Sequence, residues 1–169
     1  MSDRDALMYI YENTQMHPSG WTKEVNWNTE RRCNLWFGCR IDEGAHVVSI
    51  VLSSNRLMGR LLETDRLRQL PNLRQLFLNS NFLKGTLPEC LGQLVSLEEL
   101  NVAWNEFEGI IPESLWSLKH LTVLRLDNNR LTGGLSNQLK NYYQKHIGRI
   151  HKIHRIIYEV LSQLEDSKT

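Results

Sequence analysis

The feature that most constrains the fold is an asparagine that returns at a nearly constant interval. Asn55, Asn81, Asn105 and Asn129 stand 26, 24 and 24 residues apart, and each closes the pattern apolar-x-x-apolar-x-apolar-x-x-Asn. An interval of about 20 to 50 residues is typical of solenoids, in which successive turns of chain stack on one another. The recurrence therefore predicts a repeat protein, and it directs the search for function towards an extended surface.

The residues around each asparagine have separate structural roles. The apolar-x-apolar pair before it has the two-residue period of a short strand with one buried face. The asparagine amide has donors and an acceptor for the backbone groups of a buried turn, so stacked asparagines would form a ladder through the core. A glycine four residues later permits a tight turn. Pro88 or Pro112 then precedes a short amphipathic stretch.

These residues resemble leucine-rich repeats. The segments Leu83-x-Gly85-x-Leu87-Pro88 and Phe107-x-Gly109-x-Ile111-Pro112 are similar to the L-x-G-x-I-P signature of the plant-type subclass. The resemblance covers residues 47 to about 142. It implies an α/β solenoid, a short right-handed stack of about four turns with a parallel sheet on its concave side. The first turn departs from the pattern, because the charged spacer from Glu63 to Pro71 favours a longer helix.

Residues 1–46 are expected to cover the first hydrophobic layer, because an open solenoid exposes its end. Helical spacing relates Ala6, Leu7, Ile10 and Tyr11. Large apolar side chains follow in a loop-like stretch: Trp21, Trp27, Leu35, Trp36 and Phe37. The segment resembles the N-terminal caps that precede plant-type repeats, in the versions found in protist and bacterial proteins. We therefore expect a helical and aromatic cap.

Cys33 and Cys39 flank Trp36. Secreted plant members of the family carry a cysteine pair around this tryptophan, with one more residue between the two cysteines. The first residues of the chain have no basic region followed by an uninterrupted apolar stretch, so they do not resemble a secretory signal. Reduced thiols are therefore expected, and a disulfide in an oxidising compartment is the alternative.

Residues 137–169 are predicted to form a long amphipathic helix, because a heptad-like apolar seam runs through a stretch without proline. Its members are Leu139, Tyr143, His146, Ile150, Ile153, Ile157, Val160 and Leu164. One interpretation is a cap on the last repeat. The alternative is self-association or partner binding through the distal positions Ile150, Ile153, Ile157, Val160 and Leu164. The expected organisation is one continuous domain with a cap over 1–46, repeats over 47–136 and the helix over 137–169.

Composition and motifs exclude several function classes. The formal net charge is +1, which does not favour a nucleic-acid-binding protein. No apolar run approaches the ~20 residues that span a bilayer. The phosphate-binding G-x-x-x-x-G-K-[ST], the G-x-S-x-G elbow and H-E-x-x-H are absent from the sequence. We therefore predict a cytoplasmic protein that is not an enzyme and that has no cofactor and no metal.

A partner is expected on the concave face, where the outward strand residues of successive turns form columns. One column is Val51, Phe77, Asn101 and Arg125, and another is Ser49, Gln75, Glu99 and Val123. The predicted partner-binding residues are Gln75, Phe77, Asn79, Glu99, Asn101, Trp104, Arg125 and Asp127. Aromatic and arginine side chains are favoured at interface hot spots. The leading hypothesis is a protein-interaction module. The alternatives are an oligomeric scaffold held by the C-terminal helix and an extracellular recognition domain resembling plant receptor ectodomains.

Overall fold

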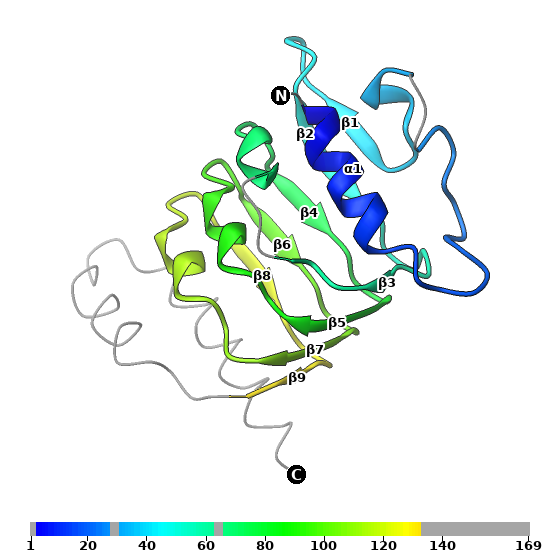
Figure 1. Ribbon diagram of the computed structural model, residues 1–169. Coiled ribbons are helices and arrows are strands. Elements are labelled where there is room, and N and C mark those ends of the chain that lie inside the picture. The colour runs from blue at the N-terminus through cyan, green and yellow to red at the C-terminus, as the bar shows by residue number, and fades with distance from the viewer. Residues whose placement is uncertain (1–2, 28–30, 63–65, 133–169) are drawn as a thin grey trace.

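The computed structural model describes residues 3–27, 31–62 and 66–132. The chain winds through a stack of turns, and each turn contributes one strand to each of two sheets (Figure 1). The first sheet has the order β1-β2-β4-β6-β8. Its strands are β1 (Cys39–Ile41), β2 (Val47–Val51), β4 (Gln75–Phe77), β6 (Glu99–Asn101) and β8 (Val123–Arg125). The pairs from β2 to β8 are parallel, as the repeat predicts, whereas β1 adds to β2 in the antiparallel sense.

A second sheet follows the asparagine of each turn, which the sequence reasoning did not predict. It has the order β3-β5-β7-β9, and its strands pair in parallel. The strands are β3 (Met58–Gly59), β5 (Phe82–Thr86), β7 (Glu106–Gly109) and β9 (Arg130–Leu131). Gly85 and Gly109 adopt φ of 81° and 76°, a conformation that favours glycine. The repeat glycine therefore belongs to a strand of this sheet.

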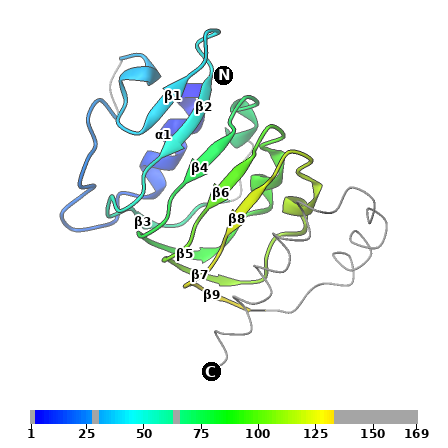
Figure 2. The same cartoon turned by 180° about the vertical axis from the view of Figure 1, so that it is seen from behind.

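Short 3-10 helices form the side of the stack opposite the first sheet (Figure 2). They are η2 (Arg66–Gln69), η3 (Glu89–Gln93) and η4 (Glu113–Ser117), and a further one, η1 (Cys33–Leu35), lies near the N-terminal end. The longer helix expected between Glu63 and Pro71 is wrong for the residues that are described, since only 66–69 are helical there. Leu67, Leu70 and Leu73 are all buried at three-residue spacing, which matches the 3-10 period.

The core consists mainly of repeated leucines that point inward from both sheets. Leu76 and Leu78 come from the first sheet and its exit, Leu83 comes from the second sheet, and all are at most 2% exposed. Burying one such side chain stabilises the fold by about 1.5–3 kcal/mol. Because each turn supplies the same positions, the core continues from one turn to the next.

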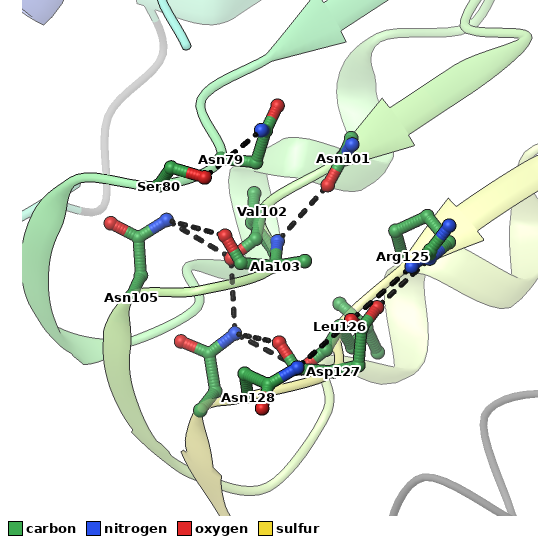
Figure 3. A network of polar contacts seen from close by, with 11 residues as sticks. Asn79, Ser80, Asn101, Val102, Ala103, Asn105, Arg125, Leu126, Asp127 and Asn128 are labelled. Atoms are coloured by element: carbon green, nitrogen blue, oxygen red, sulfur yellow. Dashed lines mark hydrogen bonds and ion pairs between the residues drawn. The ribbon is translucent and has the colours of Figure 1, made fainter. Parts of the chain in front are cut away.

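The asparagines connect consecutive turns through backbone groups. The Nδ2 of Asn105 donates to the carbonyl oxygens of Leu78 and Val102, at 3.0 Å each, and so joins its own turn to the preceding one. Its Oδ1 accepts from the backbone N–H of Leu83 at 3.0 Å. The amides of Asn81 and Asn129 make corresponding contacts, and Figure 3 shows part of this network. Asn55 differs, because its Nδ2 donates to the Lys23 carbonyl of the N-terminal segment.

The N-terminal segment packs against the first turn of the stack. Helix α1 (Asp3–Asn13) buries Ala6, Leu7 and Ile10 in the same apolar cluster as the repeat leucines. Trp27 lies at the centre of an aromatic group, with ring centroids 4.9 Å from Trp21 and 5.0 Å from Trp36. These contacts are compatible with the predicted cap. The long helix predicted for 137–169 lies outside the described residues, and the domain boundaries stay a prediction.

Candidate functional site

The outward side of the first sheet, which we call the front face, carries most of the residues predicted to bind a partner. Strand pairing aligns Gln75 with Glu99 and Val123, and Phe77 with Asn101 and Arg125, so the columns expected from the repeat are the observed ones. Backbone hydrogen bonds continue beyond the strands, where the N–H of Ser80 donates to Ala103 and that of Trp104 donates to Asp127. The backbone at Asn79, Trp104 and Asp127 therefore continues the pairing of this sheet beyond its strands, and Figure 3 shows Asn79 and Asp127 there.

Apolar side chains are exposed in several columns of the front face. Trp104 is 60% exposed, Val51 and Val123 are exposed to a smaller extent, and Phe77 is half-buried rather than fully exposed as expected. Ala103, beside Trp104 in the chain, is buried. Strand pairing places Ser49 in its predicted column beside Gln75, but the residue is buried. Its strand β2 pairs with the antiparallel β1, where Arg40 stands opposite Ser49.

A polar network occupies the face at β8. The guanidinium of Arg125 donates to both carboxylate oxygens of Asp127, at 2.9 and 3.2 Å, and Asn128 donates to the same carboxylate at 3.1 Å. These hydrogen bonds, chiefly those from Arg125, hold the pKa of Asp127 below its usual value. At physiological pH the carboxylate is therefore ionised, and it fixes the orientation of Arg125 on the surface (Figure 3).

The opposite border of the face is also polar. Gln75 donates to the Glu99 carboxylate at 3.0 Å, and Arg74 forms an ion pair with Glu98 at 3.6 Å. Ser53 donates to Asn79 at 2.6 Å, and the Oδ1 of Asn101 accepts from the backbone N–H of Ala103. Most of the predicted polar site residues thus hold one another in place, whereas Trp104 and Phe77 offer apolar surface between them.

The residue before each ladder asparagine has a left-handed backbone. The φ values of Ser54, Ser80, Trp104 and Asn128 are 52°, 58°, 55° and 56°. Short polar residues tolerate this conformation better than bulky ones, for which it is a true outlier that costs about 1–2 kcal/mol. The turn imposes the conformation in all four repeats, but only the third fills it with a large aromatic side chain. The sequence reasoning identified Trp104 as exposed and missed its strain.

The three cysteines are thiols that form no disulfide, with Cys39 and Cys90 buried and Cys33 half-buried. Burial raises the pKa of the Cys39 thiol far above its usual range, with a smaller contribution from Cys33. Burial also raises the pKa of Cys33. Both thiols are therefore protonated and weak nucleophiles at neutral pH.

The described residues also bear on metal sites and membrane spans. Within 3–27, 31–62 and 66–132, no group of His, Cys, Asp or Glu side chains has the geometry to hold a metal ion. No helix of these ranges is long and apolar enough to cross a membrane. The predicted self-association residues Ile150, Ile153, Ile157, Val160 and Leu164 lie outside them.

The chain is similar to leucine-rich repeat proteins of plants. Residues 71–131 match the family model described as Leucine rich repeat. The receptor-like protein Cf-9 homolog of Solanum lycopersicum is 33% identical over 84 residues, which make up 49% of this chain and 10% of that protein. The curated relatives that it matches are much longer, and the chain spans only about a tenth of their length.

Solved structures show the same fold over most of the chain. The structure of PEPR1–AtPEP1 has a TM-score of 0.70 at 32% identity, with 81% of this chain and 19% of that one covered. The LRR ectodomain of the Arabidopsis thaliana receptor kinase GASSHO1/SCHENGEN3, in complex with CASPARIAN STRIP INTEGRITY FACTOR 2, has a TM-score of 0.59 at 27% identity. That alignment covers 83% of this chain and 20% of the ectodomain.

Proposed function

We propose that this chain, a leucine-rich repeat protein of the plant type, is a non-catalytic module that binds a protein partner through its front face. The single observation that carries the proposal is Trp104, a large aromatic side chain that is 60% exposed on a strained backbone. Strain of this kind collects at functional sites, where the surrounding structure maintains it. A small polar residue would satisfy the turn at lower cost, as it does in the neighbouring repeats.

The surroundings of Trp104 suit recognition of a peptide or protein segment. Trp104 supplies rigid apolar area, and Arg125 is held in a fixed orientation by Asp127. Tryptophan and arginine are the residue types that most often dominate binding energy at protein interfaces. Because Arg125 is already ordered, less side-chain entropy is lost when it meets a partner. The GASSHO1/SCHENGEN3 structure, in which an LRR ectodomain is in complex with a second molecule, supports the same mode of use.

The location of the protein is a separate question. The cytoplasmic location predicted from the sequence has no support from the relatives, since the similar structures include ectodomains of plant membrane receptor kinases. An extracellular recognition domain, the alternative, is compatible with them. The scaffold alternative depends on residues of the C-terminal segment outside the described ranges, and no described contact favours it.

The proposal is tested by the affinity of a partner recovered from the native source. Partner candidates are captured on the full chain, purified, and titrated against wild type, Trp104→Ala and Arg125→Ala by calorimetry. We expect Trp104→Ala to weaken binding at least about tenfold, as truncation of an interface hot spot does. The matched control is Val95→Ala, which truncates another exposed apolar side chain, 60% exposed, just beyond η3 on the opposite side of the stack.

Circular dichroism of each variant must show an intact fold before affinities are compared. A partner that binds wild type, Trp104→Ala and Arg125→Ala equally well would rule out the front face as its site. A partner that loses affinity only for Val95→Ala would place binding on the opposite side of the stack.

A further inference from the structure

The outward side of the second sheet carries an apolar cluster that the front face does not include. We call Met16, His17, Met58 and Phe82 the lateral patch. The backbone N–H of Met16 donates to Met58 at 2.9 Å, and Met58 pairs with Phe82 across β3 and β5. The His17 ring lies over Phe82, with centroids 5.6 Å apart. Four residues from three separate parts of the sequence thus meet at the N-terminal half of this sheet, whose strands β3 and β5 are labelled in Figure 1.

The exposure of this patch is not required by the repeat. Met16 is 65% exposed and Phe82 is 42% exposed. Phe82 follows the ladder asparagine Asn81, and the corresponding positions of the other turns hold Arg56, Glu106 and Arg130. A charged side chain therefore satisfies the fold at this position. Single exposed apolar residues need no explanation, but adjacent ones on a flat sheet mark an interaction surface more often.

Cations border the lateral patch. Arg56, Arg60 and Lys84 are exposed, and in the part of the chain that the structure describes none of them forms an ion pair with a carboxylate. The side chain of Arg60 extends across β5, where its Cδ lies 3.3 Å from the point at which a side chain on Gly85 would begin. Gly85 directly follows Lys84 in β5. Further along the same sheet the charges are balanced, since Arg130 pairs with Glu106 at 3.1 Å.

We propose that the lateral patch docks a short segment of a partner protein that carries both acidic and apolar side chains. The apolar part of the segment covers Met16 and Phe82, and its carboxylates meet the exposed Arg60 and Lys84. Arginine is suited to such contacts because its planar guanidinium binds a carboxylate through two hydrogen bonds. This inference does not depend on the front face, which lies on the other sheet.

The distribution of charge favours a narrow segment over a planar anionic membrane. Glu106 and Glu108 point outward from β7 on the same sheet, and a membrane laid over the sheet would meet them as well as the cations. A peptide that covers only β3 and β5 lies beside Glu106, which pairs in register with Lys84, but does not cover it. Strand addition at the edge is also disfavoured, because Gln15 already forms a bridge with Met58 of β3.

The test uses short random peptides displayed on phage and selected on the full immobilised chain. Enriched peptides are synthesised with a fluorescent label, and their affinities are measured by anisotropy at low and high salt. We expect binders that combine Asp or Glu with apolar residues and that weaken as salt rises. Phe82→Thr and the double variant Arg60→Glu with Lys84→Glu should each weaken them about tenfold or more.

Two controls separate this surface from its neighbours. Ile110→Thr removes an exposed apolar side chain, 67% exposed, that follows β7, and it should leave affinity unchanged. Trp104→Ala should also leave affinity unchanged, because it lies on the front face. The proposal is overturned if no acidic peptide is enriched, or if the binders depend on Trp104 and not on Phe82. It is equally overturned if phosphatidylserine vesicles bind through Arg60 and Lys84 while acidic peptides do not.

Discussion

The ladder asparagines and the residues that precede them occupy the same turns of the stack, yet they differ in how far their side chains vary. The asparagine column is uniform, because the amides of Asn81, Asn105 and Asn129 satisfy backbone groups of two turns and that of Asn55 satisfies the N-terminal segment. The preceding column shares one left-handed backbone, but its side chains are Ser54, Ser80, Trp104 and Asn128. Inside the stack the fold dictates the side chain. At the surface it dictates only the backbone conformation. A side chain that fits this conformation poorly therefore indicates a role in function rather than in folding.

Removing one asparagine of the ladder is expected to lower the free energy of unfolding more than any other change considered. Asn105→Ala leaves the buried N–H of Leu83 without its partner. It also removes one amide hydrogen bond from each of the carbonyls of Leu78 and Val102, which still accept from Asn81 and Asn129. An unpaired buried group costs about 1–3 kcal/mol and a lost hydrogen bond about 0.5–1.5 kcal/mol, so we expect the free energy of unfolding to fall by about 3 kcal/mol. Urea denaturation followed by circular dichroism measures the change.

The matched control is Asn101→Ala on the front face. Its amide oxygen accepts one hydrogen bond, 3.1 Å from the Ala103 nitrogen, at a half-buried site. We expect a loss of less than about 1 kcal/mol there. Equal losses for Asn101→Ala and Asn105→Ala would show that the ladder has no special role in stability.

A smaller effect is expected when the strain of Trp104 is copied into another turn. Ser80 has the same φ region as Trp104, so Ser80→Trp should lower the free energy of unfolding by about 1 kcal/mol relative to Ser80→Asn. The two variants are compared by urea denaturation of the full chain. If Ser80→Trp is at least as stable as Ser80→Asn, tryptophan adopts this backbone conformation without cost. Trp104 would then not be strained.

The sequence predicted the parts of the fold that depend on a residue's position relative to the ladder asparagine. Once the asparagines are aligned, the columns of Phe77 and Arg125 follow, because parallel strands of equal spacing pair in equal register. The second sheet was missed, since β3, β5 and β7 each contain a glycine and β3 and β9 are only 2 residues long. The longer helix expected after Glu63 was wrong for the described residues, because a charged, leucine-bearing composition does not fix the length of a helix, and the one observed there ends at Gln69.

The candidate site was only partly predictable for a different reason. Exposure of Trp104 follows from its phase, but the left-handed backbone depends on the turn geometry, which one sequence does not reveal. Phe82 could have been noticed by the same comparison of columns, because the other turns place a charge there. The neighbouring Met16 could not, since its approach to Met58 depends on the path of the N-terminal segment.

The free energy of unfolding of Trp104→Asn, measured by urea denaturation beside wild type, tests most directly whether Trp104 is kept at a cost to stability. The measurement needs no partner. Asparagine occupies the same position one turn later, as Asn128, and it tolerates the left-handed backbone. Trp104 is mostly exposed, so little packing is lost. We predict that stability is unchanged or rises by up to about 1 kcal/mol. A fall of more than about 1 kcal/mol would show that Trp104 stabilises the fold, and would remove the main support for a binding site on the front face.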